Sequence, residues 1–391
     1  MDPIQLLLDA VLDSVRPITD GAPAAYIPEL ASADPDHLAL AVVGPRGRIF
    51  SVGDDHVEFS IQSISKPFVL ALALQEQGLD AVLERVGAEP SGEPFNAISL
   101  EALTGRPANP MVNAGAIATS ALISGDDIDE RTGRIVEMLS AFAGRSLWID
   151  EGVYRSESDT GFRNRALAHL MRSYGIVGGS VETAVETYFR QCSILVTVKD
   201  LAIMAATVAF GGTNPVTGRR VVTERIARDV LSIMASCGMY DFSGEWMLRV
   251  GLPAKSGVSG GLLAVAPSQF GVASFSPRLD EHGNSVRSTA VLERLSESFG
   301  MHVFEQHETI AEPGISVDRD VTGAVTVRLG GELGFSGAER VLTVLREVAR
   351  GASGDVVVTI DARDLARMHP AALAAIRQEL AAAGGALRLL E

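Results

Sequence analysis

The distribution of strand-like and helix-like segments constrains the fold of this chain more than any other sequence feature. Two short β patterns near the N-terminus, at residues 37–43 and 49–54, are followed by mostly helical sequence from about residue 80 to residue 240. Two further β runs, at 254–267 and 269–280, are joined by a short turn. We expect these distant strands to build one mixed sheet packed with helices, with an all-helical lobe inserted in mid-chain.

Helical periodicity predicts the elements around these strands. An amphipathic helix is expected at residues 3–16, after an Asp-Pro start. Another is expected at 63–77, where Pro67 falls near the first turn, the part of a helix in which proline costs least. Further helices are predicted at residues 115–124, 128–143, 162–174, 179–190, 197–211, 222–236 and 285–300.

The last part of the chain has a pattern of its own. Residues 305–314 are polar, contain a Pro-Gly pair and are expected to be a linker. We therefore predict a first domain over residues 1–304 and a small α/β domain over residues 313–391. In this second domain strands and helices are expected to alternate, at residues 324–333, 336–351, 355–362, 371–385 and 386–391.

Composition excludes several classes of partner and cofactor. The formal net charge is −16, and we expect neither nucleic acid nor membrane as a partner, because nucleic acids and anionic membranes both need basic surface. Hydrophobic residues make up 47% of the chain, which suffices for a sizeable core. The chain has no GxGxxG, HExxH or CxxC motif, and its histidines show no metal-ligand spacing. We expect no metal and no organic cofactor.

The compartment is also indicated by the sequence. The N-terminus carries an aspartate where a signal peptide needs positive charge, and no apolar run is long enough for a membrane span. Cys192 and Cys237 lie far apart in the sequence and are expected to be free buried thiols in a reducing compartment. We expect a cytoplasmic protein.

Lysine is rare in this chain. Only three of the 33 basic residues are lysines, namely Lys66, Lys199 and Lys255, while the other 30 are arginines. None of the three follows a glycine, which excludes a Walker A loop. Arginine stays protonated, whereas lysine can lose its proton at a desolvated site. Each lysine is therefore a candidate for chemistry that arginine cannot perform.

Ser63 and Lys66 form an S-x-x-K motif at a predicted helix start. Residues three apart share a helix face, so the serine hydroxyl and the lysine amine can lie within reach of each other. Burial and the positive end of the helix both disfavour an ammonium group there. A neutral lysine can accept the serine proton, and helix-start N–H groups can stabilise an oxyanion. The alternative is an N-cap serine followed by a surface lysine.

A second lysine motif, Lys255-Ser256-Gly257, falls at the start of a predicted strand. It resembles the K-T-G strand of serine β-lactamases and penicillin-binding proteins, in which glycine lets a ligand approach the backbone. The S-D-N motif of those enzymes is absent, so we do not expect a β-lactam substrate. Gly257 to Gly261 also match G-x-S-x-G, but that motif needs a helix directly afterwards and a strand is predicted here. Lys199 is interpreted as a first-turn residue of a helix.

Residues from about 1 to 302 resemble the bacterial serine-dependent glutaminases, which have a serine β-lactamase-like fold. The resemblance implies hydrolysis of the side-chain amide of L-glutamine without a cofactor. Seven segments in the order of that family carry it, and they are AAYIPELA (24–31), FSIQSISKPF (59–68), NPMVNAGAI (109–117), SESDTGFRNRALA (156–168), VETYFRQCSILVT (185–197), CGMYDFSGEW (237–246) and PAKSGVSGG (253–261).

The resemblance implies a role for individual residues. Ser63 would be the nucleophile and Lys66 its proton partner, while the N–H groups of Ser63 and Val258 would form the oxyanion hole. Tyr240 would relay a proton to the departing ammonia. Glutamine is a zwitterion, and Glu157 offers a carboxylate to its ammonium group. The substrate contacts implied by the family are Tyr26, Ser63, Asn113, Glu157, Asn164, Tyr188, Tyr240 and Val258.

Structural roles are the alternatives for several of these residues. Asn113 could cap the helix that is predicted to begin near Gly115, and Tyr188 could be a core residue. Glu157 and Asn164 could lie in a loop and on a helix surface.

The tail from about residue 313 resembles a STAS domain, a small regulatory or protein-binding module. The similarity rests on GGEL (330–333), the buried strand at 356–362 with its following loop, and the helix AALAAIRQEL. In STAS domains that loop often carries a phosphorylatable serine, but the stretch RDLARMHPAAL here has no serine or threonine. A protein partner or the stabilisation of an oligomer is the role that we expect for the tail.

Two alternatives to a glutaminase remain at this point. One is another serine acylase of the same fold, such as an esterase or a peptidase. The other is a signalling protein whose STAS-like tail is functional and whose front domain is inactive. For the glutaminase we expect L-glutamine as the small-molecule substrate and a homo-oligomeric assembly.

Overall fold

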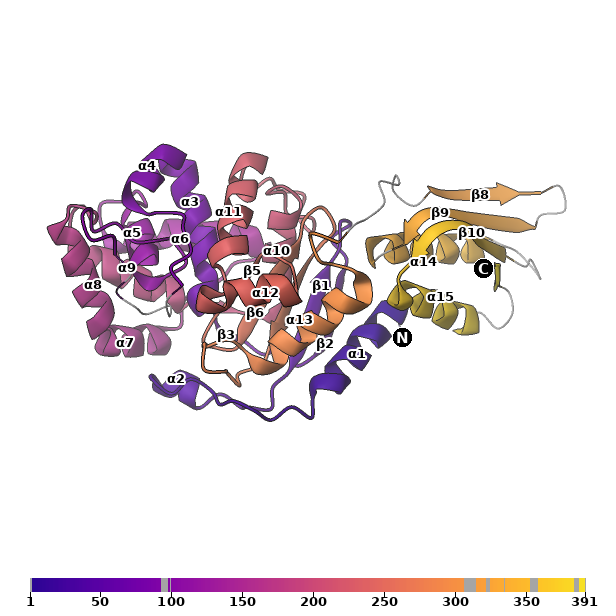
Figure 1. Cartoon of the computed structure of the whole chain (residues 1–391), viewed down its shortest axis with the longest axis horizontal. Coiled ribbons are helices and arrows are strands. Elements are labelled where there is room, and N and C mark those ends of the chain that lie inside the picture. The colour runs from indigo at the N-terminus through magenta and orange to yellow at the C-terminus, as the bar shows by residue number, and fades with distance from the viewer. Residues whose placement is uncertain are drawn as a thin grey trace. The chain divides into compact units, whose positions relative to one another are not determined.

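The chain divides into two compact units. A computed structural model describes residues 2–92, 98, 100–305, 314–320, 324–333, 335–351, 358–382 and 387–390. One unit consists of Leu12–Leu292, and the other combines Met1–Val11 with Glu293–Glu391. Almost all of the linker predicted at 305–314 lies outside the described residues. Figure 1 shows the elements of both units.

The larger unit is organised around a five-stranded sheet of the order β2-β1-β7-β6-β5. All neighbouring strands are antiparallel, and Ala41 of β1 lies opposite Ala273 of β7. The predicted pairing of distant β segments, with helices packed on the sheet, is confirmed. The expectation of a mixed sheet is wrong, because every neighbouring pair in it is antiparallel and short turns join most of its consecutive strands. The strands are β1 (Ala39–Val43), β2 (Ile49–Gly53), β5 (Ala254–Ser256), β6 (Gly261–Ala266) and β7 (Phe270–Phe275).

A buried helix covers one face of this sheet. Helix α10 (Val198–Ala209) packs against β1, β6 and β7. Gly271 of β7 allows the close approach, because a Cβ at this position would lie 2.1 Å from the backbone nitrogen of Ala206. On the helix side, the small side chains of the alanines at 202, 205 and 206 also leave room for this approach. The backbones of α10 and β7 therefore pack closely at a place where larger side chains would force them apart.

The segment between the β regions is helical, as predicted. One core cluster joins α5, α8 and α9, and a larger one joins α3, α6, α10 and α11 to the sheet. The helices are α3 (Lys66–Gln77), α4 (Leu79–Arg85), α5 (Asn113–Ala121), α6 (Ile128–Ala143), α7 (Glu151–Thr160), α8 (Phe162–Ser173), α9 (Val181–Cys192), α11 (Glu224–Cys237) and α12 (Ser243–Arg249). Of these, α4, α7 and α12 were not predicted, because they are only seven, ten and seven residues long and the helical period has little length in which to show.

A small two-stranded sheet connects the helical lobe to the start of α3. Strand β3 (Phe59–Ser60) pairs antiparallel with β4 (Leu195–Val196), which follows α9. The next residue, Ile61, donates its N–H to the carbonyl of Ile194 at 2.7 Å. The 3-10 helix η1 (Gln62–Ser65) follows and leads directly into α3. The S-x-x-K motif is thereby anchored to a segment about 130 residues away along the chain.

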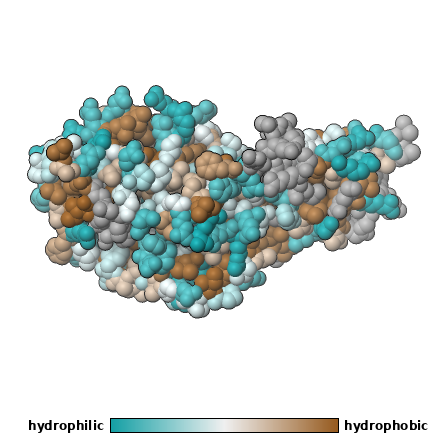
Figure 2. Space-filling model, viewed as in Figure 1, coloured by the Kyte–Doolittle hydropathy of each residue, from teal (hydrophilic) through white to brown (hydrophobic). Residues whose placement is uncertain are grey.

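The first and last helices of the glutaminase-like segment match the sequence pattern. They are α1 (Pro3–Val15) and α13 (Val286–Phe299), and a short helix α2 (Pro28–Ala31) lies in the connection after α1. None of the helices in the described part of the chain has both the length and the apolar character needed to cross a membrane. On the face drawn in Figure 2, hydrophobic residues lie in small groups between hydrophilic ones.

The C-terminal elements form a second, four-stranded sheet of the order β11-β10-β9-β8. Strands β9, β10 and β11 are parallel, β8 is antiparallel to β9, and helices α14 and α15 pack against each other. The buried residues Val327, Leu345, Ile360 and Ile376 belong to its core. The elements are β8 (Gly314–Arg319), β9 (Val325–Leu333), α14 (Phe335–Gly351), β10 (Val358–Met368), α15 (Pro370–Ala382) and β11 (Leu387–Leu390).

Two expectations for this sheet are wrong. Strand β8 was not predicted, because only one of its six residues is even partly buried and no apolar alternation marks it. The strand predicted to end at residue 362 continues to Met368. It stays paired with β9 through two register shifts, which fall at Asp361/Asp364 and Leu365/Arg367. The loop expected after residue 362 is therefore strand.

Candidate active site

Ser63 and Lys66 lie where the 3-10 helix passes into α3. The exposed fractions of the two residues are 7% and 1%. The helix predicted from residue 63 begins only at Lys66, because Gln62 has a left-handed backbone (φ 49°) and the chain turns sharply out of β3. Residues three apart eclipse each other in a 3-10 helix, so Ser63 and Lys66 still project in one direction. The surface lysine considered as an alternative is excluded.

The Lys66 amine is buried beside neutral groups. It donates to the carbonyl of Met111 at 3.0 Å and to Oδ1 of Asn113 at 2.8 Å. Burial lowers the pKa of Lys66 from 10.5 to about 7, and the neighbouring Cys192 opposes the shift only in part. A large fraction of this lysine is therefore neutral near pH 7 and able to accept a proton.

Lys255 is the second fully buried lysine. It lies in β5 at the edge of the sheet, where its amine donates to the carbonyl of Ser256 at 2.7 Å. Burial, and then the charge of Lys66, hold the pKa of Lys255 well below its usual value. The hydroxyl of Ser256 donates to Oδ1 of Asn284 at 2.5 Å. Asn284 is fully buried and had no signal in the sequence.

Tyr240 lies between the two lysines. The centre of its ring is 3.8 Å from Nζ of Lys255 and 5.7 Å from Nζ of Lys66. Burial raises the pKa of the Tyr240 hydroxyl, and a hydrogen bond with Ser63 partly offsets the rise. The tyrosine has a left-handed backbone with φ of 59°, which is uncommon for a residue other than glycine. This strained position brings a neutral phenol to the serine hydroxyl.

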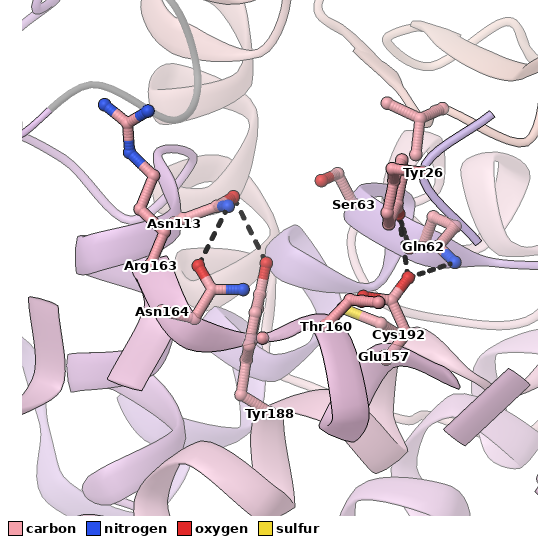
Figure 3. Close-up of a pocket in the computed structure, with 12 residues that line it drawn as sticks. Tyr26, Gln62, Ser63, Asn113, Glu157, Thr160, Arg163, Asn164, Tyr188 and Cys192 are labelled. Atoms are coloured by element: carbon pink, nitrogen blue, oxygen red, sulfur yellow. Dashed lines mark hydrogen bonds between the residues drawn. The ribbon is translucent and has the colours of Figure 1, made fainter. Parts of the chain in front are cut away.

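A cavity of about 260 Å³ opens beside Ser63. Seven predicted site residues line it, and five other residues complete its wall (Figure 3). The seven are Tyr26, Ser63, Asn113, Glu157, Asn164, Tyr188 and Val258, and the five are Gln62, Thr160, Gly161, Arg163 and Cys192. Lys66, Tyr240 and the Lys255-Ser256-Gly257 motif are not part of the lining. The size suits a ligand smaller than most drug molecules.

One side of the cavity presents a carboxylate. Glu157 of α7 is buried and accepts hydrogen bonds from the Tyr26 hydroxyl at 2.7 Å and from Nε2 of Gln62 at 3.0 Å (Figure 3). Burial raises the pKa of Glu157, and the two donors lower it. The loop position considered for Glu157 is wrong. Gln62, which orients this carboxylate next to Ser63, was not predicted as a site residue.

Another side presents amides and a phenol. Oδ1 of Asn113 accepts from Lys66 and, at 3.2 Å, from the Tyr188 hydroxyl, while its Nδ2 donates to Oδ1 of Asn164 at 3.2 Å (Figure 3). Asn113 is the first residue of α5 and makes no capping bond, so the capping role considered for it is wrong. Tyr188 is a core residue of α9, as considered, but its hydroxyl also reaches this network. The network connects Lys66 to the cavity wall.

The glycine of the K-S-G motif has a packing role. Gly257 does not line the cavity, and a Cβ on it would lie 3.1 Å from both the carbonyl of Ile61 and the side chain of Ile64. It therefore lets β5 pack closely beside η1. The serine of the G-x-S-x-G match, Ser259, is followed by β6, so the prediction of a strand there is confirmed.

The remaining predicted groups have ordinary surroundings. Lys199 forms an ion pair with Asp55 at 3.3 Å, as expected for a lysine in a first helical turn. Cys192 and Cys237 are free and buried, as predicted. Burial raises the pKa of the Cys192 thiol to about 12, which leaves a neutral thiol in the cavity wall. Within the described residues, no cluster of His, Cys, Asp or Glu has an arrangement that could hold a metal ion.

Comparisons with known proteins assign the family. The family model described as Glutaminase matches residues 21–304. Glutaminase from Corynebacterium glutamicum is 45% identical over 381 residues, which cover 97% of this chain and 91% of that protein. Glutaminase from Trichormus variabilis is 49% identical over 303 residues, which cover 78% of this chain and 91% of that protein.

Solved structures agree with the sequence comparisons. The crystal structure of Mglu in its native form has a TM-score of 0.77 and 41% sequence identity, and the similarity covers 100% of this chain and 99% of that chain. A probable glutaminase from Bacillus subtilis has a TM-score of 0.73 and 33% identity, covering 77% of this chain and 98% of that chain.

The mixed α/β fold and these matches define an enzyme of the hydrolase class. Because the family model covers well over half of the chain and relatives are 45–50% identical over most of it, the chain belongs to the glutaminase family. Its activity is that of a glutaminase, a hydrolase acting on glutamine.

Proposed function

We propose that this glutaminase hydrolyses the side-chain amide of L-glutamine to L-glutamate and ammonia through an ester formed on Ser63. The observation that carries the proposal is a buried lysine with a pKa of about 7, three residues from a serine in a cavity wall. A serine hydroxyl is a weak nucleophile unless a neighbouring base accepts its proton. Lys66 is that base.

In the first step Oγ of Ser63 attacks the carboxamide carbon while the neutral Lys66 accepts the hydroxyl proton. The oxyanion that forms is held by the backbone N–H groups of Ser63 and Val258. Support comes from their positions: Ser63 is at the start of a 3-10 helix, where N–H groups have no acceptor within the helix, and Val258 is in the turn after β5. The C–N bond then breaks. Tyr240 gives its proton to the leaving nitrogen and regains one from Lys66.

In the second step a water molecule attacks the γ-glutamyl ester. Lys66 accepts a proton from the water, and the C–Oγ bond breaks to release L-glutamate. Ser63 regains its proton from Lys66, so every group returns to its starting state. The Lys255-Ser256-Gly257 motif supports the cycle by holding Tyr240, since the Lys255 amine lies against the tyrosine ring.

Substrate recognition follows the charges of a zwitterion. We propose that Glu157 binds the α-ammonium group, supported by its burial and by Tyr26 and Gln62, which fix its orientation. Asn113, Asn164 and the hydroxyl of Tyr188 bind the α-carboxylate as neutral donors. The full set of proposed substrate contacts is Tyr26, Ser63, Asn113, Glu157, Asn164, Tyr188, Tyr240 and Val258.

We also propose a fold family, a role for the tail, a location and an assembly state for this enzyme. A serine β-lactamase-like fold is favoured by the antiparallel sheet with a lysine motif on its edge strand beside the serine turn. A STAS-like fold of the tail, and a role in binding a protein partner, are favoured by its four-stranded sheet and two helices. A cytoplasmic location suits the two free thiols. A homo-oligomer suits exposed apolar side chains such as Phe162 and Leu248.

The test is ammonia release from L-glutamine by the full chain and by Ser63→Ala. We expect the variant to lose at least about 10⁴-fold in kcat and to keep its melting temperature. The matched control is Ser32→Ala, which changes an exposed serine outside the cavity and should leave kcat unchanged. Retention of activity in Ser63→Ala would overturn the mechanism. Faster cleavage of simple esters than of glutamine would favour a general acylase.

A further inference from the structure

Arg163 is a cation at the rim of the cavity that pairs with none of the residues that the structure describes. It is the only positively charged residue among the twelve that line the cavity, and its side chain is exposed. In Figure 3 it rises past Asn113 and Asn164, on the side of the cavity away from Glu157. Within the described part of the chain it forms no hydrogen bond or ion pair. The rim therefore carries a positive charge that no described residue neutralises by direct contact.

The other arginines of the same helix are used differently. In α8, Arg165 forms an ion pair with Glu186, and Arg172 donates to the carbonyl of Val177 at 3.1 Å. Among these arginines, only Arg163 lines the cavity, and its guanidinium makes no hydrogen bond or ion pair with a described residue. The net charge of the chain is −16. In a protein of such negative net charge, a positive charge at the cavity attracts a small anion to that place.

The charges across the cavity match a zwitterion. Glu157 supplies a negative charge on one side, and Arg163 supplies a positive charge on the side of the Asn113–Asn164 amide pair. The proposed contacts of the α-carboxylate are all neutral donors, so its negative charge has no cation among them. Arg163 is the cation in the lining that can balance the charge of the α-carboxylate. Its guanidinium projects away from Ser63, so it acts by long-range attraction and not by direct contact.

We propose that Arg163 is a specificity-determining residue that attracts the α-carboxylate of the substrate and selects amino acids in which this group is free. The inference rests on the proposed orientation of glutamine, with its carboxamide at Ser63 and its α-carboxylate towards Asn113 and Asn164. Arg163 acts on the binding of the substrate and not on the chemical step. Its removal therefore raises KM and lowers kcat/KM, while kcat stays the same.

The experiment compares L-glutamine with its α-amide, in which a neutral carboxamide replaces the α-carboxylate. Ammonia release is measured for the wild type, Arg163→Gln and Arg163→Lys at low and at high salt. The matched control is Arg155→Gln, which removes an exposed arginine of α7 that does not line the cavity. All four proteins are used as full chains.

We expect Arg163→Gln to lower kcat/KM for glutamine about five-fold at low salt, the size typical of an exposed ion pair. The loss should shrink at high salt, be recovered largely by Arg163→Lys, and be absent for the α-amide and for Arg155→Gln. Equal losses for both substrates, a loss in kcat alone, or no loss would each overturn the inference. These outcomes leave the proposed mechanism intact, because that mechanism fails only if Ser63→Ala stays active.

Discussion

The starts of α3 and α10 place the same residue type in opposite environments. Lys66 is the first residue of α3 and Lys199 the second of α10, so both lie in a first helical turn. Lys66 is 1% exposed and meets a carbonyl and an amide oxygen. The Lys199 side chain is 37% exposed and pairs with the carboxylate of Asp55. Burial without a counter-charge, and not the helix position, therefore lowers the pKa of Lys66 and suits it to the proposed role of proton acceptor.

The two helix starts are also capped differently. At α10, Thr197 and Asp200 form a complete capping box, and Arg145 neutralises the aspartate. At α3, the N-cap residue Ser65 makes no capping bond, and its hydroxyl donates instead to the carbonyl of Gln62 at 2.7 Å. The start of α10 is arranged for helix stability. At the start of α3 the backbone N–H of Lys66 donates instead to the carbonyl of Ser63, so no side chain is used as a cap beside Ser63.

The largest effect that tests the difference between Lys66 and Lys199 is expected when each lysine is exchanged for arginine. Lys66→Arg places a permanent cation where a neutral amine is required, so kcat should fall by about 10²- to 10⁴-fold. Lys199→Arg keeps the ion pair with Asp55 and should retain kcat within about two-fold. Ammonia release measured for both variants under the same conditions checks the pair. Equal activities in the two variants would contradict the distinct roles.

A second test uses stability instead of activity. The pKa of Lys66 is about 7 in the folded protein and near 10.5 when the chain is unfolded, so between these values the unfolded state binds more protons. Stability therefore rises with pH in this window by about 1 kcal/mol per pH unit relative to Lys66→Met, and it levels off below pH 7.

Urea unfolding of the wild type and of Lys66→Met between pH 7 and pH 9 measures the difference. Lys199→Met provides the comparison, since its difference from the wild type should change much less over the same range. A constant difference for Lys66→Met would mean that Lys66 keeps an ordinary pKa in the folded state.

The smallest effect is expected at Lys199 itself. Lys199→Met removes one partly exposed ion pair with Asp55, and such pairs contribute less than about 1 kcal/mol. Its free energy of unfolding at pH 7 should stay within that limit, and kcat should not change. A loss of several kcal/mol would show that this helix start depends on the ion pair more than its exposure suggests.

Most of the larger unit could be predicted because its elements carry strong periodic patterns. The helix predicted at 128–143 coincides with α6, and three of the four predicted β runs became β1, β2 and β7. The run predicted at 254–267 is divided by a turn into two strands, β5 and β6. The polar helix α7 was missed, since EGVYRSESDT buries only Val153 and Glu157 and its start depends on a capping bond from Asp150. Because the sequence around Glu157 is polar, it could not be distinguished from a loop, and the burial of the carboxylate became clear only from its hydrogen-bond partners.

The site was predictable where a motif or a family segment marked it. Ser63 and Lys66 followed from their spacing, and Glu157 from a family segment, although that segment did not reveal the partners of its carboxylate. Gln62 and Asn284 were missed because buried amides leave no pattern in a sequence. Arg163 directly precedes Asn164 in a segment that was recognised. The sequence could not show that Arg165 and Arg172 have partners among the described residues whereas Arg163 has none there.

The pH dependence of kcat/KM tests the central claim most directly. The account predicts an ascending limb with an apparent pKa of about 7, since neutral Lys66 must accept the Ser63 proton. Lys199→Arg should keep this limb, and Glu157→Gln should keep it at reduced activity, because neither removes the base. A profile that is flat from pH 6 to pH 8 would contradict the account.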